Sequence, residues 1–179
     1  MWCRRIFAAC ALALLSLGGW SQEARPEFAA RLQLQPQALS HYAVWGFDVY
    51  DARLWTTPDF EVRQYPRHTF ALELQYLRKL QGDAIAERSM SEMRRQASFP
   101  KDKAPAWLDA MRRVFPDVAR GDRIVGIHLP GQGAEFWFNG RPIGQVADPQ
   151  FAQLFFGIWL DERTSEPQLR ARLIQGLRP

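Results

Sequence analysis

The fold of this chain is decided by residues 121–161, which read GDRIVGIHLPGQGAEFWFNGRPIGQVADPQFAQLFFGIWLD. Hydrophobic and aromatic residues fall here into three short runs, which glycine-containing turns separate. Asn139-Gly140 predicts a two-residue type I′ turn, since both residues readily adopt the positive φ angles that this turn needs. The stretch therefore predicts three antiparallel strands, at residues 123–129, 134–138 and 141–146.

A helix is expected directly after the third strand. Asp148 is a residue type that caps helix N-termini with its carboxylate, and Pro149 suits the first turn, where no backbone N–H is needed. Hydrophobic residues continue to Leu160, where we expect the helix to end. Gly131-Gln132-Gly133 precedes a strand and not a helix, so it predicts a turn and not a phosphate-binding loop.

The part of the chain before residue 121 predicts further strands and two helices. Two strands are expected within residues 40–55, meeting at a bend or bulge at Gly46. Residues 69–77 alternate large hydrophobic residues with small or polar ones, which indicates a strand with one buried face. Helices are expected at residues 84–97 and 105–115, and a last one opens at Ser165 and Pro167 and ends near Gly176.

The 84–97 helix shows the clearest pattern. Asp83 is its expected N-cap. One apolar face is formed by Ala86, Met90, Met93 and Ala97, so Arg88, Glu92 and Arg95 are expected to point elsewhere. The order of strands and helices predicts an α+β fold, an antiparallel sheet with helices packed on one side.

This order, together with VYDARLW at residues 49–55 and AIAERSMSEMRR at residues 84–95, resembles the bacterial exported branch of the chalcone isomerase-like family. The resemblance covers residues 40–177 and implies a chalcone isomerase-like open-faced β-sandwich. It also implies a cleft between the sheet and the 84–96 helix. In plant isomerases an Arg, a Thr and a water network, helped by a Tyr and an Asn, hold the substrate oxygens in that cleft, and relatives without isomerase activity hold a fatty acid through an Arg.

Matched by position, the plant Arg falls near Leu39, the Thr on Tyr50 and the Asn on or near Ser89. The anion-binding Arg is therefore missing from the expected strand, and Arg88 and Arg53 are the candidate substitutes. Arg88 could instead pair with Glu92 at the surface, and Arg53 with Asp51. The resemblance implies that Tyr50, Arg88 and Ser89 contact the polar end of a ligand, whose apolar part lies among side chains such as Leu54, Met93 and Phe155.

The N-terminus has the features of a secretory signal peptide. Arg4 and Arg5 precede an apolar run that is too short to span a bilayer comfortably, and small residues follow it. We expect residues 1–21 to be the signal, with cleavage at 18–24, then an extended lead-in at 22–39 and the domain at 40–179. The protein is thus expected to be exported, periplasmic or secreted, without stable membrane insertion after cleavage.

Composition excludes several functional classes. The chain has 23 Lys and Arg residues and 19 Asp and Glu residues, and removing Arg4 and Arg5 with the signal leaves 21 basic and 19 acidic residues. The basic residues form no stripe, so no nucleic-acid partner is expected. Both cysteines, Cys3 and Cys10, fall in the expected signal, which leaves no disulfide or thiol nucleophile. The usual hydrolase, metal and phosphate motifs are absent, and we expect no catalytic residue, metal or cofactor.

We therefore expect an exported chalcone isomerase-like protein without isomerase activity that holds a small apolar or amphipathic ligand, fatty acid-like or aromatic. One alternative is a lyase or isomerase that acts on an enolisable aromatic substrate, with Tyr50 as acid or base. Another is an envelope interaction module whose cleft is filled by its own aromatic side chains. The sequence leaves the oligomeric state open.

Overall fold

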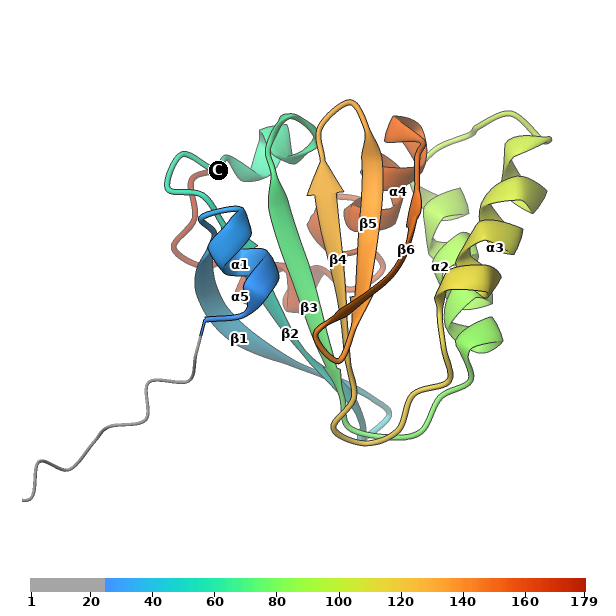
Figure 1. Cartoon of the computed structure of the whole chain (residues 1–179), viewed down its shortest axis with the longest axis horizontal. Coiled ribbons are helices and arrows are strands. Elements are labelled where there is room, and N and C mark those ends of the chain that lie inside the picture. Colours follow the sequence, from blue (N-terminus) through green and yellow to red (C-terminus); the bar gives the residue numbers. More distant parts are fainter. Residues whose placement is uncertain (1–24) are drawn as a thin grey trace, which may run out of the picture.

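The computed structural model describes residues 25–179, which form one antiparallel sheet with helices around it (Figure 1). The expected signal peptide lies outside the described residues. None of the helices within residues 25–179 is long and apolar enough to cross a membrane. Each of the six strands pairs with the next strand along the chain: β1 (Gln35–Val44), β2 (Phe47–Thr56), β3 (Phe70–Tyr76), β4 (Arg123–Leu129), β5 (Gly133–Phe138) and β6 (Arg141–Val146).

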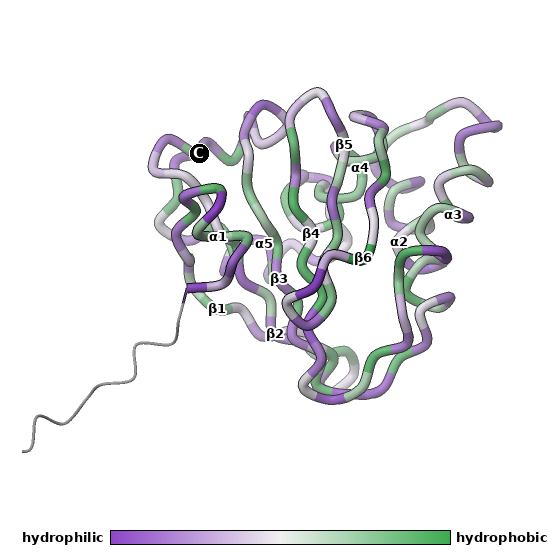
Figure 2. The backbone as a smooth tube through the Cα atoms, viewed as in Figure 1, coloured by the Kyte–Doolittle hydropathy of each residue, from purple (hydrophilic) through white to green (hydrophobic). Residues whose placement is uncertain are grey.

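The larger helices cover one face of this sheet. They are α2 (Gly82–Gln96), α3 (Lys103–Val114), α4 (Pro149–Leu160) and α5 (Pro167–Leu173), and a short 3-10 helix spans Val62–Arg67. The α4 helix packs on β4 and β5, α5 packs on β1 and β2, and α2 contacts both α3 and α4. In Figure 2, hydrophobic and hydrophilic residues alternate along α2 and α3, as amphipathic helices require. The α+β fold with an antiparallel sheet is confirmed.

The opposite face of the sheet is not fully open, because a short helix covers part of it. This helix is α1 (Glu27–Arg31), and Phe28 packs edge-on against Trp55 and Trp137, with ring centroids 5.5 and 6.4 Å apart. Ala71 is fully buried beneath the same cluster, so β3 has two buried faces where one was expected. The expected extended lead-in to residue 39 is wrong for the described part, since α1 lies within it and β1 already begins at Gln35.

The two tight hairpins of the sheet are built in the same way. Asn139 and Gly140 have φ angles of 47° and 80°, which confirms the type I′ turn between β5 and β6. Trp45 and Gly46 have φ angles of 49° and 82° between β1 and β2. The expected bend near Gly46 is thus a complete hairpin turn.

Of the two expected N-caps one is right and one is wrong, and the last helix differs in length. The Asp148 carboxylate accepts hydrogen bonds from the backbone N–H groups of Gln150 and Phe151, at 2.8 and 3.1 Å, and so caps α4 as expected. Asp83 does not cap α2, because the helix begins one residue earlier and the Gly82 N–H donates to Asp117 at 2.9 Å. The last helix is shorter than expected, since α5 begins at Pro167 and ends at Leu173.

His128 lies in the middle of the core, on β4. Its ring is 2% exposed and stacks on Phe70 at 5.0 Å, and its Nδ1 lies 2.8 Å from the carbonyl oxygen of His68, to which it donates. Burial lowers the pKa of His128. The opposite holds for His41 on β1, where hydrogen bonds to Asp51 and Asp48 raise the pKa.

These two histidines predict opposite contributions to the pH dependence of stability. The pKa of His128 is lower in the folded state than in the unfolded state, where it is about 6.5. The contribution of neutral His128 to the free energy of unfolding is therefore complete above about pH 6.5 and is lost as the pH falls, by at most about 1.4 kcal/mol per pH unit. We expect His128→Phe to flatten the loss of melting temperature between about pH 7 and 5. His41 acts the other way, since its contribution is complete below its unfolded pKa, so His41→Asn should steepen that loss. Parallel melting profiles for parent and both variants would contradict these assignments.

Candidate functional site

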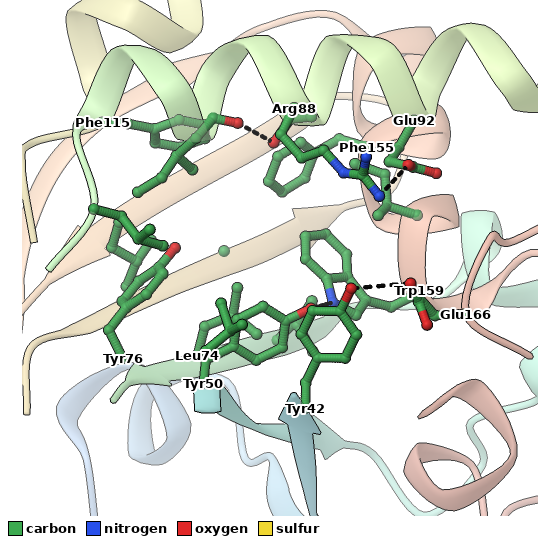
Figure 3. Close-up of a pocket in the computed structure, with 18 of the residues that line it drawn as sticks. Tyr42, Tyr50, Leu74, Tyr76, Arg88, Glu92, Phe115, Phe155, Trp159 and Glu166 are labelled. Atoms are coloured by element: carbon green, nitrogen blue, oxygen red, sulfur yellow. Dashed lines mark hydrogen bonds and ion pairs between the residues drawn. The ribbon is translucent and has the colours of Figure 1, made fainter. Parts of the chain in front are cut away.

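A cavity of about 550 Å³ lies between the sheet and the helices α2 and α4 (Figure 3). Its walls are mainly apolar. The sheet contributes hydrophobic residues from β3 to β5, and the helices close it from the other side with Ile85, Phe155, Phe156 and Trp159. Cavities of this size and composition are typical of small-molecule sites.

All three predicted site residues line this cavity. Tyr50 points from β2, and its hydroxyl oxygen accepts a hydrogen bond of 3.0 Å from Trp159 Nε1. Burial raises the pKa of Tyr50, so the phenol stays protonated and keeps its own hydrogen to donate. Ser89 lies on α2, where its Oγ donates to the Ile85 carbonyl at 2.8 Å and still has lone pairs facing the cavity.

Arg88 lines the cavity and is also paired. Its guanidinium lies 2.8 Å from Glu92 on the next helical turn, as the alternative to a free Arg predicted. The Glu92 side chain is only 7% exposed, whereas that of Arg88 is 65% exposed. The expectation that Glu92 points away from the cleft is wrong, because Ile85, Arg88, Ser89 and Glu92 share the face of α2 that α4 and the sheet enclose.

Sequence reasoning missed four polar residues of the cavity, which are Tyr42, Tyr76, Ser165 and Glu166. Tyr42 pairs with Tyr50 across β1 and β2, and Tyr50 pairs with Tyr76 across β2 and β3, so the three rings stand side by side on one face. The Tyr42 hydroxyl donates to Glu166 at 2.9 Å, and burial together with this bond raises its pKa to about 12. Only the strand register, which one sequence does not give, would have revealed this row.

Other predicted residues lie elsewhere. Leu54 and Met93 are fully buried in the core and do not line the cavity, whereas Phe155 does. Leu39, at the position of the plant Arg, is 56% exposed on the opposite face of the sheet, and Arg53 lies on that face too. The proposed pairing of Arg53 with Asp51 is not formed, since Asp51 hydrogen-bonds to His41 at 2.8 Å.

Within residues 25–179, no group of three or more His, Cys, Asp or Glu side chains is arranged to hold a metal ion. Gly131 and Gln132 lie in the turn between β4 and β5, as expected, and Gly133 is the first residue of β5. The chemistry available in the cavity is therefore hydrogen bonding from tyrosines and two serines, together with the charges of Arg88, Glu92 and Glu166.

Comparison with known proteins places the chain in a family. Residues 27–175 match the family described as chalcone isomerase-like, and the chain belongs to that family. It is 28% identical over 142 residues to an uncharacterized protein of Haemophilus influenzae, covering 78% of this chain and 67% of that protein. Its fold is similar to the crystal structure of a fatty-acid binding protein of Arabidopsis thaliana, with a TM-score of 0.55 and 12% identity over 76% of this chain and 83% of that one.

Proposed function

We propose that this protein binds an amphipathic ligand with an uncharged polar end in the cavity, and that it does not catalyse isomerisation. The cavity itself supports this most directly. It provides about 550 Å³ of mainly apolar space, and its hydroxyl and charged side chains come from only a few positions on β1 to β3, α2 and the chain before α5. Ligand binding by the structural neighbour, which is described as a fatty-acid binding protein, is consistent with such a role.

The charges around the cavity favour an uncharged polar end over a carboxylate. Arg88 is the cationic residue of the lining, and Glu92 pairs with it at 2.8 Å and, outside the lining, with the exposed Arg95 at 3.6 Å. Glu166 adds a second carboxylate, so the lining carries one excess negative charge. A ligand carboxylate would be repelled, whereas a hydroxyl or carbonyl group can accept from the protonated tyrosines, and a hydroxyl can also donate to Glu166.

The same groups argue against catalysis. Deprotonating a substrate requires a free base, and burial keeps Tyr50 and Tyr76 protonated. The two carboxylates of the lining are already engaged, since Glu92 pairs with Arg88 at 2.8 Å and Glu166 accepts from the Tyr42 hydroxyl at 2.9 Å. The sheet contributes no Arg to the cavity lining, so a developing oxyanion would lack the donor that typically accounts for about a hundredfold in rate. The open volume also argues against the interaction module whose cleft is filled by its own side chains.

Export is part of the proposal. The sequence features of residues 1–21 support secretion to the periplasm or beyond, followed by release of the mature domain. An apolar ligand with low solubility in water would need a carrier in such a compartment.

Filling the cavity from α2 tests the proposal. Ser89→Trp places a large ring inside the cavity, whereas Ser91→Trp adds the same ring to the exposed side of the same helix. We expect Ser89→Trp to weaken binding of Nile red, an uncharged fluorescent probe, by about tenfold or more, the equivalent of about 1.4 kcal/mol. Ser91→Trp should bind like the parent, and native mass spectrometry before and after lipid extraction should show a co-purified species only in proteins with an open cavity.

Two results would count against this function. Equal probe binding by both variants, at similar melting temperatures, would place the ligand outside the cavity. Acceleration of chalcone cyclisation above the spontaneous rate, abolished by Tyr50→Phe, would instead support the isomerase alternative.

A further inference from the structure

The turn between β1 and β2 exposes two large aromatic side chains. Trp45 is 95% exposed and Phe47 is 63% exposed, and the remaining large exposed hydrophobic residue of the described chain, Leu39, lies on the other face of the sheet. Trp45 also adopts a φ of 49°, which is unfavourable for a bulky side chain. Exposure and backbone strain both oppose this arrangement in an isolated molecule, which indicates that the exposed rings have a partner.

This turn lies at the entrance of the cavity. Val44, Trp45 and Val49 all belong to the cavity lining. In Figure 1 the turn is at the lower end of the sheet, beside the connections from β3 to α2 and from α3 to β4. Whatever covers Trp45 and Phe47 therefore also faces the route into the cavity.

Exposed basic side chains lie on the connection beside Phe47. The Arg78 guanidinium lies 5.7 Å from the centre of the Phe47 ring, and Lys79 follows it. Arg120 reaches the same connection, where it donates to the Leu77 carbonyl at 3.2 Å. In the described part of the chain, none of these three cations forms an ion pair.

The neighbouring carboxylates are engaged elsewhere. Asp48 points to the other face of the hairpin, where it hydrogen-bonds to His41 at 3.0 Å. Asp122 accepts from the backbone N–H of Ala119 at 2.7 Å and from Asn139 at 2.9 Å. These donors are neutral, so Asp122 keeps its negative charge and offsets one of the three cations. The side of the turn that carries Phe47 is thus aromatic and keeps a net positive charge.

We propose that this patch, formed by Trp45, Phe47, Arg78, Lys79 and Arg120, docks on a lipid bilayer with anionic headgroups and turns the cavity entrance toward the membrane. Aromatic side chains favour the bilayer interface, and basic ones are attracted to anionic lipids. Two rings that bury about 150–250 Å² each fall far short of the roughly 1,200 Å² of a stable protein interface. Reversible attachment to a membrane needs no such area. Membrane docking does not depend on the proposed function. Only the entry of a ligand from the membrane rests on that function.

Sedimentation with vesicles tests the proposal. Parent protein, with its signal removed, should sediment with phosphatidylcholine vesicles containing phosphatidylglycerol and much less with pure phosphatidylcholine. Trp45→Asn combined with Phe47→Ser should weaken this binding by about tenfold or more, because both anchoring rings are lost. Asn tolerates the positive φ of position 45, so the variant should melt no lower than the parent. Arg78→Gln with Lys79→Gln, which leaves only Arg120 of the three cations, should weaken the preference for anionic lipid and the sensitivity to salt.

Leu39→Ser, on the opposite face, is the matched control and should bind vesicles like the parent. Docking is overturned if the parent binds neither kind of vesicle, or if the aromatic variant binds vesicles as well as the parent does. If the parent does not bind vesicles but forms a dimer, and the aromatic variant is a monomer, the patch binds a second copy of the chain. This result would also overturn membrane docking. Nile red binding separates this inference from the proposed function, since vesicle binding without probe binding would leave docking intact and refute the cavity ligand.

Discussion

Gly133→Ala is expected to destabilise the protein by about 3 kcal/mol or more, because two separate costs add at this position. Gly133 has a φ of 133°, in a region that side chains rarely adopt. A Cβ there would lie 2.1 Å from the Val146 carbonyl oxygen and 2.8 Å from the Asp148 backbone nitrogen. Those backbone atoms join the end of β6 to the N-cap of α4, so they cannot move away without loosening the helix above the cavity.

Gly131→Ala is the matched control, since it lies in the same turn with a φ of 70° and nothing within 4 Å of the added Cβ. Gly131→Ala should destabilise the protein only through the unfavourable φ angle, by about 1–2 kcal/mol. Urea denaturation of both variants measures the difference. If the two free energies of unfolding were equal, the close approach at Gly133 would not have the role assigned to it.

Glu92→Gln is expected to convert the cavity from one that disfavours carboxylates to one that accepts them. The parent Glu92 pairs with Arg88 at 2.8 Å and more loosely with Arg95 at 3.6 Å, and its low exposure of 7% limits screening by solvent. Removing its charge leaves both cations without this carboxylate. Two unit charges about 4 Å apart interact by about 4 kcal/mol at an effective dielectric constant of about 20, so even a fraction of this repulsion is measurable. We expect palmitate to bind the variant about tenfold or more tightly than the parent, with hexadecanol unchanged.

Glu87→Gln provides the control for Glu92→Gln. Glu87 is on the same helix and also pairs with an Arg, at 2.8 Å from Arg112, but it is exposed and outside the cavity lining. Competition against Nile red gives the affinities. Tight palmitate binding by the parent, lost in Arg88→Ala, would show that Arg88 is available to a carboxylate and would contradict the uncharged polar end proposed above.

Local signals in the sequence were sufficient for the C-terminal half of the fold. Asn139-Gly140 and Asp148-Pro149 specify a turn and a helix start through the conformational preferences of the residues themselves, and both are confirmed. The N-terminal helix α1 has no such signal. The few hydrophobic residues in and just after it, Phe28 and Leu34 among them, alternate with polar ones, and Phe28 is buried only because Trp55 and Trp137, distant in sequence, form a surface for it.

The candidate site shows the same division. Tyr50, Arg88 and Ser89 could be proposed from a family resemblance, and they do line one cavity. Tyr42 and Glu166 could not be proposed in this way. They are 124 residues apart, and their hydrogen bond connects β1 to the chain just before α5. Glu92 was misplaced since its charge suggested a solvated position, whereas the ion pair with Arg88 allows it to be buried.

The sequential order of the six strands has a consequence for how the protein reaches its final shape. Each strand can pair with a partner that is already available, so the sheet can grow vectorially from β1 to β6 as the chain emerges from a ribosome or a translocation channel. The cavity cannot form at the same pace, because Phe155, Phe156 and Trp159 arrive with α4, after all the strands. A growing intermediate therefore exposes the hydrophobic floor of the cavity until α4 is present, and a chaperone that binds exposed hydrophobic surface would act at this stage.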